Sequence, residues 1–170
     1  MSRLGLLAPG ARMSLARLAG LVIALICVVA PALPWGPLAA SPPLPLAVMW
    51  AAYGWAAMGE TGWRAPVVLF LLGLLQDQLS GGPLGLFAII YLAGFLLGRT
   101  AATATRSANL FTEWAGFIAT MIAVCALAAL IAPPALGGAA KIGPFALAAG
   151  ITALLFPLVR PLYIVGRAKA

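Results

Sequence analysis

Apolar segments follow one another along this chain, and the polar breaks between them are too short to form a soluble domain. Hydrophobic residues make up 64% of the 170 residues and charged residues only 8%. A soluble core of this size could not bury so much apolar surface, so the pattern predicts an all-α, polytopic integral membrane protein. Its length indicates a single membrane domain.

Six of these segments are candidates for membrane-spanning helices. The expected spans are about 15–33, 44–58, 63–80, 83–98, 110–131 and 143–159. The second is short and begins in the proline-rich stretch 31–45, where repeated loss of amide donors prevents a continuous helix. This stretch is either a loop or a partly re-entrant segment. Trp50, Tyr53 and Trp55 form an aromatic face at helical spacing, which predicts packing against lipid or the core near an interface.

The basic residues predict the orientation of the bundle. With six spans and a cytoplasmic N-terminus, all of the 10 Lys and Arg residues except Lys141 lie on the cytoplasmic side. A five-helix alternative without the second span places the basic C-terminus outside. The basic N-terminus also imitates a signal peptide, but the apolar run 18–33 is long enough to remain as a span. We therefore expect both termini in the cytoplasm.

Few residues are available for chemistry. There is no histidine and the acidic residues total three, so a serine or cysteine protease triad, a zinc site and an intramembrane aspartyl dyad all lack members. We expect no catalytic residue, metal or cofactor. The net charge of +7 is scattered between apolar segments and forms no patch for nucleic acid. Cys27 and Cys125 lie within apolar runs, which indicates buried apolar side chains.

Two smaller features predict packing between helices. Small residues recur every four positions on one face of the first span, at Ala16, Gly20 and Ala24. This ladder permits close packing, most simply within the bundle. Glu113, near the start of the fifth span, is placed to pair with Arg99 or Arg106 as an exposed ion pair of small energetic weight.

The one aspartate, Asp77, lies between the third and fourth spans. Only residues 80–82 separate the two arms, so the arms are expected to be antiparallel neighbours. Gly81 and Gly82 permit the backbone angles of a reversal, and Pro83 suits the first position of the second helix. Asp77 would then lie near the amide dipoles at that helix's start.

Two interpretations of Asp77 stay open. It marks a membrane boundary, or it belongs to a folding or contact site at which Gly73, Gly81 and Gly85 let backbones approach closely. Neither interpretation is catalysis.

The residues around Asp77 carry a resemblance to a known family. They read Gly73-Leu74-Leu75-Gln76-Asp77, Leu79-Ser80-Gly81 and Pro83-Leu84-Gly85, and continue through an apolar helix to Gly98-Arg99. This run, within a stretch of about a fifth of the chain, resembles the signature of the bacterial rod shape-determining protein MreD family. The first and last 60 residues carry no matching motif.

The resemblance implies a non-enzymatic, multi-pass protein of the bacterial inner membrane that serves cell elongation and peptidoglycan synthesis. Its implied partners are MreC directly, and RodA, the transpeptidase partner of RodA and MreB filaments more broadly. In this interpretation Gly73, Asp77, Gly81, Pro83 and Gly85 fix the shape of a hairpin on which a partner docks. The sequence leaves open a homo-oligomer and a lipid or ligand in a groove.

Two other functions remain as alternatives. The family is thought to resemble the six-helix substrate-binding subunits of energy-coupling-factor transporters, which implies a small-molecule site in the membrane. Candidate lining residues are Gln76, Asp77, Gln78, Trp50, Tyr53 and Trp55. An enzyme acting on lipid-linked precursors would depend on Asp77, with Lys141 as the only other titratable group on the outer side.

Overall fold

The computed structural model describes residues 9–29, 46–59, 62–81, 83–104, 109–135 and 142–163. These residues form helices and no strand: α1 (Pro9–Val29), α2 (Ala47–Ala57), α3 (Arg64–Ser80), α4 (Leu86–Ala104), α5 (Leu110–Ala135) and α6 (Ile142–Tyr163). The prediction of an all-α fold is confirmed. Three of the helices are long and apolar enough to cross a membrane, over 86–104, 110–131 and 143–161, which indicates a membrane protein.

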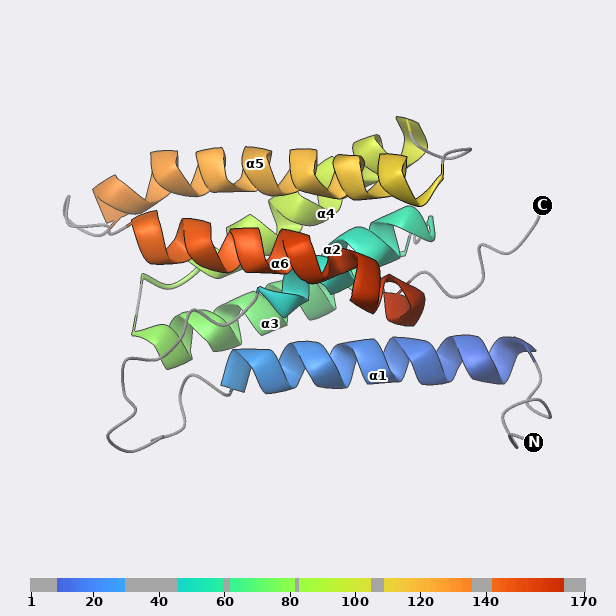
Figure 1. Ribbon diagram of the computed structural model, residues 1–170. Coiled ribbons are helices and arrows are strands. Elements are labelled where there is room, and N and C mark those ends of the chain that lie inside the picture. The colour runs from blue at the N-terminus through green and yellow to red at the C-terminus, as the bar shows by residue number, and fades with distance from the viewer. Residues whose placement is uncertain are drawn as a thin grey trace, which may run out of the picture.

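The helices form a bundle in which successive elements run in opposite directions (Figure 1). The first residues of α1 and the last of α6 lie at the same end of the bundle, on the right in Figure 1. The end of α3 and the start of α4 lie at the opposite end. The connection between these two helices is therefore far from the start of α1.

The short helix α2 is the centre of the bundle. Each of its 11 residues is buried, and it packs against α1, α3, α4 and α6. At 1.5 Å per residue it is about 17 Å long, roughly half the thickness of a bilayer's hydrocarbon core. The predicted aromatic face therefore lies inside the protein: Trp50, Tyr53 and Trp55 are core residues, so they pack against protein and not against lipid.

The N-terminus of α2 is held at the middle of α6. The backbone N–H of Leu46 donates to Thr152 Oγ1 at 2.7 Å, and Trp50 Nε1 donates to the Thr152 carbonyl at 2.9 Å. Thr152 is itself fully buried and lies halfway along α6. A helix that begins inside an apolar bundle needs such partners, because its first amides have none within the helix.

Two glycines lie where α2 and α4 come into close contact, a packing role that the sequence analysis did not predict. A Cβ at Gly94 would lie 2.5 Å from Met49 Cε, and one at Gly98 would lie 3.2 Å from Tyr53 Cδ2. The spacing Gly94-x-x-x-Gly98 is typical of tightly packed membrane helices. In the predicted ladder on α1, Gly20 and Ala24 are buried, and the side chain of Ala16 is outside the described residues.

Several helix ends differ from the predicted ones. Helix α1 begins at Pro9, a residue suited to a first helical position, and α4 continues to Ala104. Helix α5 extends to Ala135, and α6 runs through Pro157 and Pro161 to Tyr163. The proline-rich stretch 31–45 and Lys141 lie outside the described residues.

Candidate functional site

The Asp77 carboxylate joins the two arms of the α3–α4 hairpin. Asp77 lies in the last turn of α3 and is only 1% exposed. Its Oδ2 accepts the N–H of Gly85 at 2.8 Å, and its Oδ1 accepts the N–H of Phe87 at 2.9 Å. Amides at a helix start have no partner within the helix and carry a partial positive charge. Asp77 therefore caps α4 from a different helix, in the position expected from the sequence.

Two glycines supply the backbone angles of the reversal. Gly81 ends α3 in the left-handed conformation with φ 65°, and Gly85 has φ 94°. A Cβ on either would meet no atom within 4 Å. The expectation that they allow close backbone approach is thus wrong, because it is their positive φ that disfavours other residues. Gly82 lies outside the described residues.

Gly73 is the glycine that does permit close approach. A Cβ at this position would lie 2.4 Å from the Cα of Ala88 and 2.5 Å from its N. The backbones of α3 and α4 therefore touch about one turn from Asp77. This contact holds the carboxylate within reach of the α4 amides.

Pro83 precedes α4 and is not its first residue, which corrects the prediction. The helix starts at Leu86, whose N–H is 3.4 Å from the Pro83 carbonyl oxygen. Gly85 cannot be helical at φ 94°, so the helix begins after it. The N–H groups of Gly85 and Phe87 at the start of α4 donate to Asp77, so the helix start is capped without a proline as its first residue.

A second side-chain bond lies beside the Asp77 bonds. The hydroxyl of Tyr91, which is buried in α4, donates to Gln76 Oε1 of α3. Phe87 packs on Tyr91 and on Phe145 of α6, with ring centroids 5.9 and 6.3 Å apart. Gln76 and Asp77, which the sequence offered as lining for a ligand site, both bond within the hairpin. Their neighbour Gln78 is exposed.

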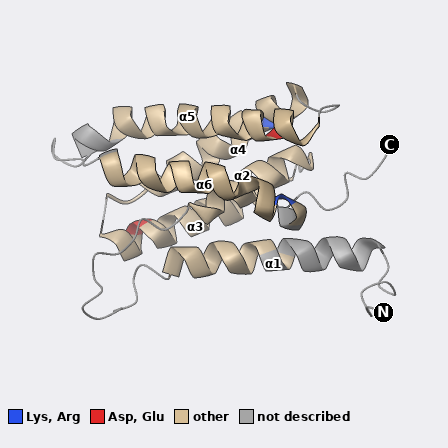
Figure 2. Ribbon diagram, in the orientation of Figure 1, with Lys and Arg blue, Asp and Glu red and all other residues tan. Residues whose placement is uncertain are grey.

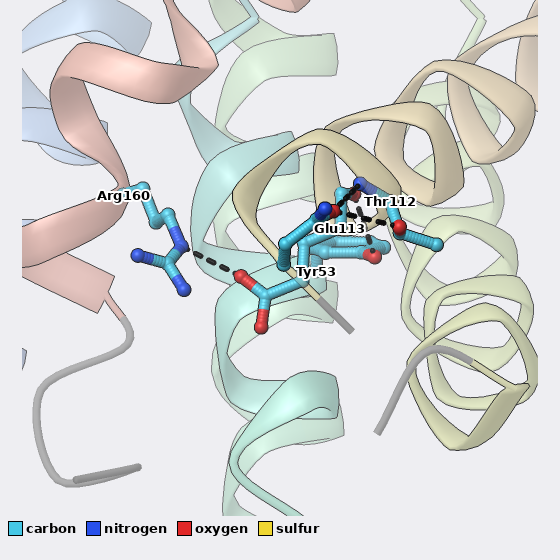
Figure 3. A network of polar contacts seen from close by, with 5 residues as sticks. Tyr53, Thr112, Glu113 and Arg160 are labelled. Atoms are coloured by element: carbon cyan, nitrogen blue, oxygen red, sulfur yellow. Dashed lines mark hydrogen bonds and ion pairs between the residues drawn. The ribbon is translucent and has the colours of Figure 1, made fainter. Parts of the chain in front are cut away.

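The second buried carboxylate among the described residues, Glu113, forms an ion pair at the opposite end of the bundle (Figure 2). Glu113, in the first turn of α5 and 4% exposed, accepts a hydrogen bond from Arg160 Nε of α6 at 2.6 Å. The Tyr53 hydroxyl of α2 donates to the Glu113 carbonyl at 3.2 Å (Figure 3). The predicted exposed pair with Arg99 is wrong, because Glu113 faces the bundle and Arg99 is exposed. Arg106 lies outside the described residues.

Two tryptophans bond to α6 where a proline interrupts its hydrogen bonding. Pro157 has no N–H, so the Ala153 carbonyl lacks its normal helical partner. Trp114 Nε1 of α5 donates to this carbonyl at 2.8 Å, and Trp50 Nε1 bonds the adjacent Thr152 carbonyl. Sequence reasoning missed both bonds. For the Trp114 bond the available signal was a proline inside an apolar segment, whose freed carbonyl needs a donor from a neighbouring helix.

The described residues offer little for catalysis or metal binding. They contain no group of three His, Cys, Asp or Glu side chains that could hold a metal ion. The two described carboxylates, Asp77 and Glu113, belong to opposite ends of the bundle, so they do not form an acid–base pair. Cys27 and Cys125 are half-buried free thiols.

Comparisons of the chain with protein-family models, with curated proteins and with solved structures find no match. The geometry of the α3–α4 hairpin therefore carries the functional argument.

Proposed function

We propose that this protein is a non-enzymatic inner-membrane component of the bacterial cell-elongation machinery, of the MreD type. It would scaffold or regulate peptidoglycan synthesis through contacts with MreC, RodA, the transpeptidase partner of RodA and MreB filaments. The observation that carries the proposal is the pair of hydrogen bonds that the Asp77 carboxylate accepts from the backbone N–H groups of Gly85 and Phe87. The residues on which the resemblance depends are those that shape the hairpin, and they supply form, not chemistry.

The hairpin presents an apolar surface for a partner. Leu84, in the turn before α4, is 67% exposed, and Leu79 at the end of α3 is exposed as well. The same arm exposes Phe70, Leu71 and Leu75 toward its outer side. A turn held by partly buried hydrogen bonds keeps such side chains in fixed positions, which lowers the entropy lost when a partner helix or juxtamembrane segment docks.

We further propose six spans with both termini in the cytoplasm. The start of α1 and the end of α6 share one end of the bundle, as an even number of crossings requires (Figure 1). The arginines whose side chains are described belong to the same end: Arg64 opens α3, Arg99 lies in the second half of α4, and Arg160 lies in the last turn of α6. Cytoplasmic flanks carry such an excess of arginine, so the hairpin turn would face outward.

An affinity purification tests the proposal. The tagged protein is recovered from gently solubilised membranes, and the co-purified proteins are quantified by mass spectrometry. We expect MreC and the elongation synthases with the wild type, and less of them with Asp77→Ala and Gly85→Leu. Gly150→Leu is the matched control, because Gly150 is exposed on α6 with open space around its Cβ position. Recovery of an ATPase module and a coupling subunit would overturn the proposal in favour of transport.

A further inference from the structure

Arg160 bonds the described part of the chain through only one of its donor groups. Its Nε donates to Glu113 Oε2. In Figure 3 the dashed line to Glu113 starts at Nε, and no dashed line starts at the two terminal nitrogens. Among the described residues these nitrogens have no hydrogen-bond partner. A guanidinium has five N–H donors in a fixed planar arrangement, so four remain for another acceptor. The side chain is 33% exposed, which leaves them accessible.

The position of Arg160 along α6 places it at the edge of the bilayer. The apolar part of α6 runs from Gly143 to Pro161, about 28 Å at 1.5 Å per residue, close to the thickness of the hydrocarbon core. Arg160 is next to its last residue. Nearby on α5, Phe111 and Trp114 pack edge to face near the start of the apolar part, where interfacial aromatic residues gather. The acceptors at this depth are the phosphates of lipid headgroups.

Arg160 differs from the other arginines at its end of the bundle. Arg64 and Arg99 are exposed and make no ion pair with any described residue. Arg160 is oriented by the carboxylate of Glu113, a buried residue. The backbone carbonyl of Glu113 in turn accepts a hydrogen bond from the hydroxyl of the buried Tyr53. A guanidinium that is already ordered loses less entropy when it binds an anion.

We propose that Arg160 and the adjoining ends of α5 and α6 form a binding site for the phosphate of an anionic phospholipid. The Nε group keeps its bond to Glu113, and the terminal nitrogens hold the phosphate oxygens as charge-assisted hydrogen bonds. An anionic lipid is favoured over a zwitterionic one, because the described side chains at this end of the bundle include three arginines and one glutamate. The site goes beyond the proposed role in cell elongation and does not depend on it.

Native mass spectrometry of the purified full chain tests the site. The detergent solution is supplied in turn with phosphatidylglycerol, phosphatidylcholine and a diacyl glycolipid without phosphate. We expect one phosphatidylglycerol retained in preference to phosphatidylcholine, and no retention of the glycolipid. In Arg160→Lys an ammonium still pairs with Glu113, but it has two spare N–H donors instead of four and no planar pair of terminal nitrogens to hold two phosphate oxygens, so retention should weaken about tenfold, the scale of one lost charge-assisted bond. Arg99→Lys is the matched control and should bind as the wild type does.

Three results would overturn the inference. Equal retention of the glycolipid by the wild type would show that acyl chains alone are bound. Equal loss in Arg99→Lys and Arg160→Lys would show a diffuse effect of charge. Displacement of the lipid by excess inorganic phosphate would assign the site to a free anion. The comparison of lipids on the wild type decides the matter even if Arg160→Lys does not fold.

Discussion

At the scale of single residues, Asp77 contributes by satisfying two amides at once. Both of its oxygens accept N–H groups of the α4 start, and the side chain is removed from solvent. Removing the carboxylate would leave two partly buried donors without this partner, which costs more than the bonds themselves contribute.

We expect Asp77→Ala to lower the free energy of unfolding by about 3 kcal/mol, since a hydrogen bond to a charged group contributes about 1.5–3 kcal/mol and two are lost. Asp77→Asn keeps an acceptor for one amide only and should lose roughly half as much. Thermal unfolding in detergent measures both. Gln78→Ala, a change at the exposed neighbour, should stay within about 0.5 kcal/mol. Equal stability of Asp77→Ala and Gln78→Ala would refute this account of the hairpin.

Gly73 and Gly150 offer the same substitution in two environments. Gly73→Ala drives a Cβ into the backbone of Ala88, so we expect a loss of about 1–3 kcal/mol. Gly150→Ala fills open space on α6 and should gain up to about 1 kcal/mol, because alanine is the better helix former. Opposite shifts in melting temperature are expected. A gain in both would mean that α3 and α4 do not touch at Gly73.

The hairpin was predictable because its signals are local. Asp77, Gly81 and Gly85 lie within a few residues of one another, and a short loop permits few arrangements. The partner of Glu113 was not predictable, because Arg160 is 47 positions away and the choice depends on which way α5 faces. Pro83 is a local exception: its suitability for a helix start was overridden by the positive φ of Gly85, an angle that the sequence does not specify.

At the scale of the elements, α2 and α6 depend on each other. Thr152 of α6 receives both the first amide of α2 and the indole of Trp50. The sequence could not place α2 at the centre, because a short apolar helix has the same composition whether it faces lipid or protein. The available signal, which the sequence analysis did not use, was the spacing of Gly94 and Gly98 in α4, since both lie against α2.

A double-mutant cycle tests the role of Trp114 at the proline of α6. We expect Trp114→Phe to cost about 1 kcal/mol, because the Ala153 carbonyl loses its donor. In a Pro157→Ala background the restored amide can bond that carbonyl, so the same change should cost much less. Unfolding free energies of the four proteins give the coupling. Additive effects, within about 0.3–0.5 kcal/mol, would show that the indole does not replace the missing amide.

At the scale of the whole molecule, the alternation of the helices predicts which ends face outward. After Cys27 and Cys125 are replaced by alanine, single cysteines are introduced at the exposed positions Ser80 and Thr103. A membrane-impermeant maleimide should label Ser80→Cys in intact spheroplasts and Thr103→Cys only after permeabilisation. Ser80 is the last residue of α3 and Thr103 lies in the last turn of α4, at opposite ends of the bundle. The reverse labelling would invert the proposed orientation.

Site-specific photo-cross-linking most directly tests whether the α3–α4 hairpin is the partner surface. A photoreactive phenylalanine derivative replaces Leu84 in the hairpin turn or Ile122 in the middle of α5, whose exposures of 67% and 65% are closely matched. Cells are irradiated and the adducts of the purified protein are identified. The account predicts an MreC adduct from position 84 and none from position 122. An MreC adduct from position 122 alone, or no adduct from position 84 while MreC still co-purifies, would contradict it.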